Sequence, residues 1–187
     1  MTPAAIQRME AALARWGRGE SSAFVEIVRE HQAMVFSMAY YFLHDRSVAE
    51  EIAQDVFLRL YRNLAGIKSP AHLMLWLRKV TSRRCIDEVR RNPARPQVSL
   101  EEAPEPFDPS PPSDPLLSRR LRRLVTSLPE NARMVIILRF QEELELAEIA
   151  EILEIPINTV KSRLQRSLAM LREKLDTVLE SAGDEAD

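Results

Sequence analysis

The sequence predicts an all-α protein made of two small helical domains joined by a Pro-rich acidic linker. The chain of 187 residues has only 6% aromatic residues and four glycines, and it is rich in Leu, Ala, Glu and Arg, which favour helices. Apolar residues recur three and four positions apart in both halves. Prolines gather near the middle of the chain, so the predicted helices fall into two groups.

The first two expected helices occupy the start of the chain. Apolar residues recur at helical spacing from Ile6 to Trp16, before two closely spaced glycines. A second apolar stripe runs towards Phe42, and either Ser21 or Ser22 can cap the start of its helix.

Two further helices complete the first domain, residues 1–91. Asp45 or Ser47 opens a third helix, VAEEIAQDVFLRLYRNL, which stops at a glycine. Ser69 can cap a fourth helix with Pro70 in its first turn, and this helix runs to about Arg91. Four such helices are expected to form a compact bundle.

The segment 92–115 separates the two domains. It reads NPARPQVSLEEAPEPFDPSPPSDP and contains eight of the twelve prolines together with five acidic residues. Because proline removes backbone donors and interrupts helices, we expect an extended acidic linker here.

The second domain, residues 116–187, is expected to contain four helices and a frayed tail. Its start, LLSRRLRRLVTSLPENARMVIILRF, holds two helices that separate near Pro129. A short helix covers Leu144–Leu153, and a longer helix follows the turn EIPIN, with Asn158 as its cap and an end near Leu179.

The last two helices have the spacing of a helix-turn-helix. Apolar residues at intervals of three and four place one stripe of each helix against the other. These residues are Leu146, Ile149, Ala150 and Leu153 on the first helix, and Val160, Leu164, Leu168 and Leu171 on the second.

The second helix of this pair is basic although the chain has a formal net charge of -2 at pH 7. Hydroxyl groups at its start and arginines further along suit a helix that enters the DNA major groove. The predicted groove-facing stripe is Thr159, Ser162, Arg163 and Arg166, with Lys161 and Gln165 on its flanks near phosphates. Most basic stripes are only solvated helix faces, but the helix pair, the turn and the stripe together favour duplex DNA.

The third helix carries a candidate protein interface. Glu51, Gln54, Asp55 and Arg62 surround Leu58, which resembles the apolar centre and polar rim of such an interface. The alternative is an ordinary solvated face with one stray leucine.

A second basic cluster lies on the fourth helix, beside the loop GIKSPAH. Cationic side chains next to an irregular loop suit a single nucleic-acid strand with an unstacked base. The candidate residues are Lys68, Ser69, His72, Arg78, Lys79, Arg83 and Arg84.

Other features limit the chemistry and the location of the protein. Cys85 is the single cysteine, which rules out an intrachain disulfide and fits a reducing cytosol. No signal pattern and no stretch of about 18 apolar residues is present, so we expect a cytoplasmic protein without membrane insertion. His31, His44, His72 and Cys85 match no metal motif, so neither an enzyme nor a cofactor is expected.

Taken in order, these motifs resemble those of the extracytoplasmic-function (ECF) sigma factors of the bacterial sigma-70 family. The resemblance covers most of the chain. The strings that carry it are AFVEIVREHQAMVF, AEEIAQDVFLRLYRNL, WLRKVTSRRCIDEVRR, LPENARMVIILRF and LAEIAEILEIPINTVKSRLQRSLAMLREKL.

The resemblance implies a promoter-specificity subunit of RNA polymerase that performs no catalysis. The helix around Leu58 would dock on the β′ clamp helices of the core enzyme. The GIKSPAH loop and the fourth helix would melt and read the minus-10 element as a single strand. The second domain would read the minus-35 element as duplex and meet the β flap, and the linker would thread the polymerase cleft. Such a protein works at the nucleoid, and an anti-sigma factor, able to hold it at the membrane, is an expected partner.

One alternative stays open, and several residues depart from the family pattern. A stand-alone regulator would bind duplex DNA through the second domain without polymerase, normally as a dimer on a palindrome. Arg83 stands where the family commonly has Asn, Glu154 where the turn often has Gly, and Glu143 and Glu145 replace a frequent Gly and a Ser/Thr cap. We expect Glu154 to adopt a left-handed conformation or a slightly different turn, and the cap at Glu145 to be weak.

Overall fold

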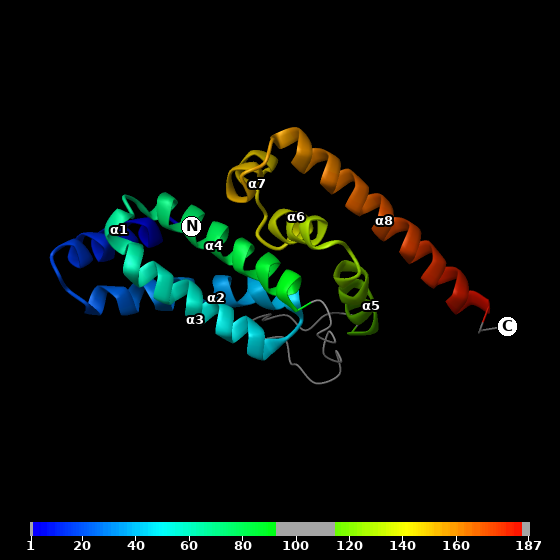
Figure 1. Ribbon diagram of the computed structural model, residues 1–187, viewed down its shortest axis with the longest axis horizontal. Helices are drawn as coiled ribbons and strands as arrows, with labels where there is room; N and C mark the ends of the chain where they lie inside the picture. The colour runs from blue at the N-terminus through cyan, green and yellow to red at the C-terminus, as the bar shows by residue number, and fades with distance from the viewer. Residues whose placement is uncertain (1, 93–114, 185–187) are drawn as a thin grey trace. The chain divides into compact units, whose positions relative to one another are not determined.

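The computed structural model describes residues 2–92 and 115–184, with side chains described for 2–92 and 121–176. Almost all of the predicted linker, residues 92–115, therefore lies outside the described part. Every regular element within the described residues is a helix, which confirms the predicted all-α class (Figure 1). None of these helices combines the length and the apolar character that a membrane span requires.

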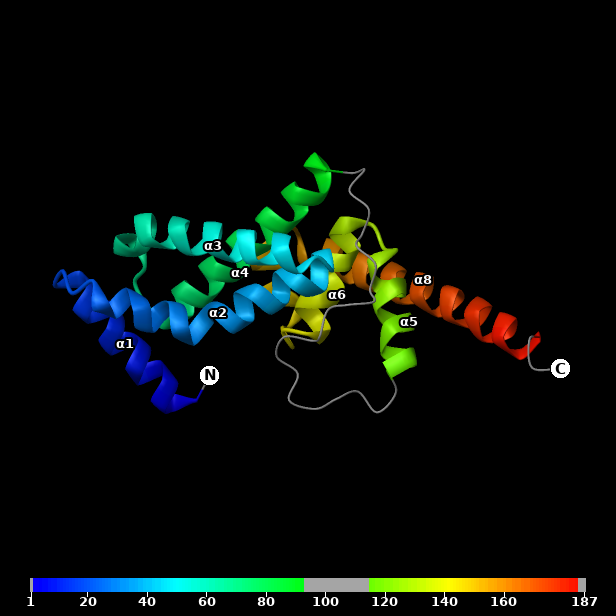
Figure 2. The same ribbon diagram turned by 90° about the horizontal axis from the view of Figure 1, so that it is seen from below.

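The described residues form two compact units, one within residues 1–95 and the other within 96–187. The first unit contains α1 (Pro3–Gly17), α2 (Ser22–Leu43), α3 (Arg46–Asn63), the short 3-10 helix η1 (Leu64–Gly66) and α4 (Pro70–Arg91). Helix α2 packs against α1, α3 and α4, as Figures 1 and 2 show from two sides. The predicted four-helix bundle is thus confirmed, with α2 at its centre.

Side-chain caps fix the starts of two helices in this unit as the sequence predicts. Asp45 Oδ1 accepts a hydrogen bond from the Val48 N–H at 3.0 Å at the start of α3. Ser69 Oγ accepts one from the His72 N–H at 3.1 Å at the start of α4. The predicted serine cap of α2 is wrong, because Ser21 precedes that helix in an α-helical conformation without a side-chain cap hydrogen bond.

One face of α3 and one face of α1 contribute to the core of the bundle. Ile52, Val56 and Leu60 of α3 are buried. On α1 the predicted apolar stripe is only partly buried, because Met9 lies in the core together with Ala12, whereas Ile6 is 39% exposed. Small alanines on the inner side of α1 allow the helix to approach α2 closely, which turns the larger Ile6 outward.

Helix α4 buries small polar side chains in its second half. Thr81, Ser82 and Cys85 are all buried, and Thr81 Oγ1 donates to the Leu77 carbonyl at 2.7 Å. Trp76, on the same helix, is only half-buried. Small side chains let α4 lie close to its neighbours, so the bulky indole stays at the edge of the core.

The second unit contains α5 (Pro115–Thr126), α6 (Glu130–Phe140), α7 (Leu146–Leu153) and α8 (Ile157–Asp184). The long helix α8 packs against each of the other three (Figure 1). Lys174 Nζ donates to Ser127 Oγ at 2.6 Å and so joins the distal half of α8 to the end of α5.

A buried arginine holds the turn between α5 and α6 together. Arg133 is only 4% exposed, and its Nη2 donates to the carbonyl of Thr126 and, at 3.2 Å, to that of Leu128. Burial lowers the pKa of Arg133, while the nearby Glu130 acts in the opposite direction. The guanidinium therefore satisfies carbonyl groups that the break at Pro129 leaves without helical donors.

Both turns that flank α7 contain a glutamate in the left-handed region. The φ angle is 53° at Glu143 and 55° at Glu154, which confirms the conformation expected for Glu154. The start of α7 is held by its own third residue, because the Glu145 N–H donates to Glu148 Oε2 at 2.8 Å. Arg139 Nη1 adds a contact of 3.1 Å to Glu145 Oε1. Glu148 and Arg139 thus stabilise a start that lacks a Ser/Thr cap.

The start of α8 differs from the prediction by one residue. The helix begins at Ile157, and the Pro156 carbonyl accepts hydrogen bonds from the Thr159 N–H at 2.8 Å and the Val160 N–H at 3.2 Å. The prediction that Asn158 caps α8 is therefore wrong. Asn158 lies inside the first turn, two residues after the N-cap position, which Pro156 occupies.

Candidate nucleic-acid and protein interfaces

Buried residues on α8 define which side of this helix faces outward. Val160 and Ser167 are fully buried, whereas Leu168, expected in the core, is 43% exposed. Seven residues return an α-helix close to the same side, so Ser167 lies below Val160, and Leu168 is turned away. Ser167 Oγ donates to the Arg163 carbonyl at 2.7 Å, which satisfies the hydroxyl in its apolar surroundings.

The burial pattern of α8 differs from the prediction in which residues lie at the centre of the outward face and which lie at its edge. Lys161, Gln165 and Arg166 are exposed, whereas Thr159 and Arg163 are half-buried. Lys161 and Gln165, expected on the flanks, therefore lie near the centre of the outward face. Thr159 and Arg163, expected at its centre, lie towards one edge.

Ser162 is the remaining candidate on α8. It is half-buried, and its Oγ donates to the Thr159 carbonyl at 3.1 Å. That bond uses the hydroxyl proton, so the oxygen remains as an acceptor for a partner. Ser162 is thus suited to a donor such as a base amino group rather than to a phosphate.

The cations of α8 are available for an external partner. Within the described residues, the side chains of Lys161, Arg163 and Arg166 form no ion pair or hydrogen bond. Unpaired cations on one helix attract a polyanion, and binding releases the counterions of that polyanion. The helix pair α7–α8 therefore has the surface of a helix-turn-helix DNA-binding protein.

The acidic side chains beside this surface limit where a duplex can lie. Glu148, Glu151 and Glu154 are exposed on α7 and directly after it. Carboxylates repel phosphates, so these three glutamates disfavour a duplex that lies over α7.

The loop before α4 is shaped by two of its candidate residues. Ser69 Oγ caps α4, and His72 Nδ1 accepts a hydrogen bond from the Lys68 N–H at 3.3 Å. These bonds leave the exposed Lys68 side chain at the surface of a fixed loop. Ser69 and His72 therefore contribute to the shape of the loop as well as to its surface.

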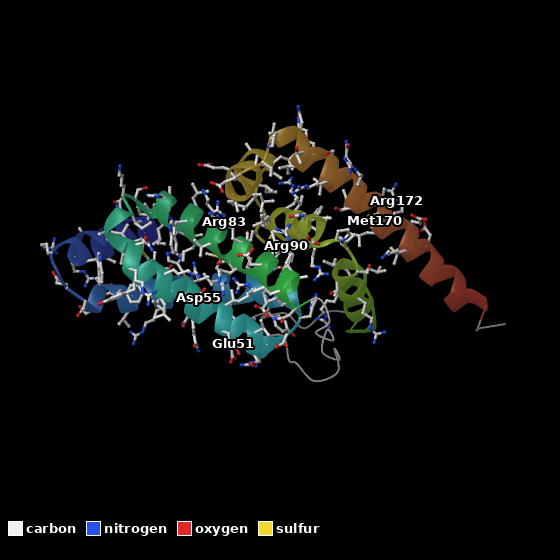
Figure 3. The ribbon with its side chains drawn as sticks, in the orientation of Figure 1. Glu51, Asp55, Arg83, Arg90, Met170 and Arg172 are labelled. Atoms are coloured by element: carbon white, nitrogen blue, oxygen red, sulfur yellow. The ribbon has the colours of Figure 1, made fainter. Side chains whose placement is uncertain are left out.

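The basic cluster of α4 is tied to α3 at one point. Arg84 Nε lies 2.5 Å from Asp55 Oδ2, and the Arg84 side chain is only 18% exposed. The same carboxylate oxygen accepts a hydrogen bond from Arg59 Nε at 2.8 Å. The structure thus brings together two residues that the sequence assigned to different partners, Arg84 to DNA and Asp55 to protein. Figure 3 shows Asp55 on α3 and Arg83 on α4.

The other basic candidates of α4 differ in exposure. Arg83 is exposed, and Arg78 and Lys79 are half-buried. Arg83 and Arg90 lie along α4 in Figure 3, seven residues apart and so on one side of the helix.

Apolar and aromatic side chains form an exposed patch on α3. Leu58 is 59% exposed and Tyr61 52% exposed, three residues further along the same helix. The Tyr61 ring centroid lies 5.2 Å from that of Trp16 and 5.1 Å from that of Phe24, in edge-on arrangements. Tyr61 is not among the interface residues predicted from the sequence, although its spacing of three residues from Leu58 places both on one face.

The polar residues predicted around Leu58 are distributed along α3. Glu51, Gln54 and Arg62 are exposed, while Asp55 is half-buried by its arginine partners. Glu51 and Asp55 appear along α3 in Figure 3. The patch therefore has an apolar centre with a polar rim, as protein interfaces have.

The residues considered for enzyme chemistry do not form a site. His31, His44 and Cys85 are buried, and burial raises the pKa of the Cys85 thiol far above its ordinary value. In the part of the chain that the structure describes, no three His, Cys, Asp or Glu side chains are grouped to hold a metal ion.

Comparison with known families identifies both units. The model of sigma-70 region 2 matches residues 27–95, and that of sigma-70 region 4 matches residues 118–171. The chain is 30% identical over 171 residues to the ECF RNA polymerase sigma factor SigW of Bacillus subtilis (strain 168), covering 84% of this chain and 91% of that protein. The chain belongs to the ECF sigma factors of the sigma-70 family.

Solved structures share the fold. CnrH in complex with the cytosolic domain of CnrY matches with a TM-score of 0.67 and 21% identity, covering 91% of this chain and 98% of that one. The sigma factor RpoE of Bartonella quintana, in complex with the anti-sigma factor NepR, matches with a TM-score of 0.64 and 20% identity, covering 82% and 96%.

Proposed function

We propose that this protein binds core RNA polymerase and directs it to a specific set of promoters as an ECF sigma factor. One observation carries the proposal: the matches to sigma-70 regions 2 and 4 fall on both units of one chain. A stand-alone regulator that binds duplex DNA would need only the second unit. The members of this family are regulatory proteins, so we expect no catalytic activity and no cofactor.

The outward face of α8 is proposed to read the minus-35 element as duplex DNA. Lys161, Gln165 and Arg166 are exposed there, and two of these three side chains are cationic. An arginine pairs well with guanine N7 and O6, and a lysine also suits phosphates. Ser162 would contribute an acceptor, with Thr159 and Arg163 at the edge of the groove.

The loop before α4 and the stretch of α4 from Arg78 to Arg84 are proposed to melt and read the minus-10 element as a single strand. Lys68 and Arg83 are exposed, and Arg78 and Lys79 are half-exposed beside them. Cationic side chains of this kind follow a single-stranded backbone. Ser69 and His72 hold the loop in shape, and Arg84 is proposed to fix α4 on α3 through Asp55 rather than to contact DNA directly.

The patch on α3 is proposed to dock on the β′ clamp helices of core polymerase, while the second unit meets the β flap. Leu58 is the most exposed apolar residue on α3, and Tyr61 adds an aromatic surface beside it. Glu51, Gln54 and Arg62 form the polar rim. Exposed apolar residues at the centre of a patch account for much of the affinity of an interface.

An anti-sigma factor is a further proposed partner, because the relative RpoE of Bartonella quintana has been solved in complex with one. Such a partner would compete with polymerase and could hold the protein at the membrane. The protein is proposed to work in the cytoplasm at the nucleoid, where its promoter DNA and core polymerase are found.

The test is transcription by the purified protein together with core polymerase on genomic fragments. We expect binding to core and start sites that share a minus-35 and a minus-10 element. Failure to bind core, with tight binding to a palindromic duplex instead, would favour the stand-alone regulator.

A matched pair of variants tests the docking patch. Leu58→Asp should weaken core binding by about 2 kcal/mol or more, because it places a charge at the centre of the interface. Ile6→Asp changes an exposed apolar residue on α1 in the same way and should leave core affinity unchanged. Equal affinities for the two variants would contradict the assignment of the α3 patch.

A further inference from the structure

One polar side chain in the first turn of α8 makes no hydrogen bond within the part of the chain that the structure describes. Asn158 is exposed, and the helix starts before it, so its amide does not cap the helix. The Pro156 carbonyl receives the first helical N–H groups instead. Among the side chains that the structure describes, that of Asn158 forms no hydrogen bond. Its donor and its acceptor are therefore both available to a partner.

The register of α8 places Asn158 on the outward face. Asn158, Lys161 and Gln165 are separated by three and four residues, so they form one stripe, and all three are exposed. Val160 and Ser167 are fully buried and fix the opposite side of the helix against the second unit. Asn158 is thus the first side chain of the exposed stripe.

The position of Asn158 along α8 is the one from which base edges are read. In a helix-turn-helix, residues near the start of the second helix reach base edges in the major groove. A short side chain suits this place, because the start of the helix lies deepest in the groove. Asn158 has this length, whereas Lys161 is long enough to reach phosphates.

The carboxamide group selects one base among the four. It offers one acceptor and one donor side by side, and adenine presents the complementary N6 donor and N7 acceptor in the major groove. Guanine presents two acceptors there and is better matched by an arginine or a lysine.

We propose that Asn158 reads an adenine in the minus-35 element and is a specificity-determining residue of this sigma factor. The inference rests on the proposed function, since it requires that α8 enters the major groove of that element.

The experiment uses the full chain bound to core polymerase on a promoter with a systematically substituted minus-35 element. Unmodified protein should prefer an A·T pair at one position by at least about fivefold. Asn158→Ala should lose that preference and keep the preferences at all other positions. Replacing the same adenine by 7-deazaadenine, which lacks N7 as an acceptor, should weaken binding of the unmodified protein but not of the variant.

Two controls separate the possible results. Lys161→Ala should weaken binding to all sequences alike and reduce its salt dependence, as loss of a phosphate contact does. The melting temperature of Asn158→Ala should equal that of the unmodified protein, because no cap is removed. A lowered melting temperature with an unchanged base profile would return Asn158 to a structural role and overturn the inference. If the holoenzyme initiates normally and Asn158→Ala reads the same bases, this inference alone fails. If no promoter is used at all, the proposed function fails first.

Discussion

The basic residues of α8 and those of α4 differ in what they already contact. On α8 the side chains of Lys161, Arg163 and Arg166 have no partner within the described residues. On α4 the Arg84 guanidinium pairs with Asp55, and Arg83 also takes part in an interaction within the chain. Similar numbers of cations in a sequence therefore do not give similar nucleic-acid surfaces.

The difference has a direct consequence for binding energy. A free cation gains the full benefit of displacing counterions from DNA. A cation that already has a carboxylate partner must exchange one attraction for another, so its net gain is smaller. We therefore expect α8 to bind duplex DNA through charge, and α4 to act through the fixed shape of its loop and helix.

The largest expected effect tests this contrast directly. Arg166→Ala should weaken binding to the minus-35 duplex by about 1–3 kcal/mol if it pairs with a base, because a free and exposed guanidinium is lost. If Arg166 contacts a phosphate instead, a plot of the logarithm of the binding constant against the logarithm of the salt concentration should become less steep by about 0.9. The measurement is holoenzyme affinity across a salt series.

Arg84→Ala is the counterpart of that variant on α4. It should leave the salt dependence of minus-10 strand binding unchanged, because Arg84 pairs with Asp55 and is proposed to have no direct contact with DNA. A fall in slope equal to that of Arg83→Ala would show that both arginines contact the strand, and the contrast between the two helices would be lost.

A smaller effect measures the ion pair itself. A double-mutant cycle with Asp55→Asn and Arg84→Gln should give a coupling energy of about 1 kcal/mol in the unfolding of the protein, since both side chains are partly buried. Chemical denaturation of the two single variants and the double variant provides the measurement. Additive effects would mean that the two residues act independently.

The turn before α8 offers a stabilising change that should not alter recognition. Glu154→Gly should raise the free energy of unfolding by about 0.5–1 kcal/mol, because the left-handed backbone is unfavourable for glutamate and not for glycine. Glu151→Gly, within α7, is the matched control and should destabilise by about 1 kcal/mol. Thermal melting of both variants decides between these outcomes.

The smallest expected effect is a pH dependence that arises from one buried side chain. Burial lowers the pKa of His31, Glu30 opposes that shift, and Arg78 of α4 adds to it. The unfolded chain then takes up a proton at His31 below its ordinary pKa of about 6.5, whereas the folded chain does so only at lower pH. The stability is therefore complete above about pH 6.5 and is lost as the pH falls through the lowered pKa.

Melting temperatures between neutral and mildly acidic pH check this expectation. His31→Gln should remove part of the slope, since glutamine does not titrate. If His31→Gln leaves the dependence of the melting temperature on pH unchanged, that dependence arises from other groups.

The sequence predicted the helices well and the side-chain assignments less well. Helix periodicity, together with caps such as Asp45 and Ser69, places α3 and α4 correctly, because those signals are local. The sequence predicted less well which face of α8 is buried. A stripe of leucines suggested that Leu168 faces the core, but close packing against a neighbouring helix buries the small Ser167 instead.

Local sequence patterns cannot predict which side chains pair across two helices. Asp55 and Arg84 stand 29 residues apart in the sequence, and only the packing of α3 on α4 brings them together. Tyr61 was overlooked for a related reason. An aromatic residue on a helix is usually assigned to the core, whereas Tyr61 is 52% exposed and contacts the rings of Trp16 and Phe24 with the rest of its side chain.

The contact between Lys174 and Ser127 sets a limit on how far the DNA-reading half can be shortened. Every side chain proposed to meet DNA lies before residue 168, and the match to sigma-70 region 4 ends at 171. A fragment trimmed at that boundary would keep the whole reading surface and yet lose the ammonium group that holds the end of α5. The minimal autonomous fragment therefore has to include the distal half of α8, which carries none of the side chains proposed to meet DNA.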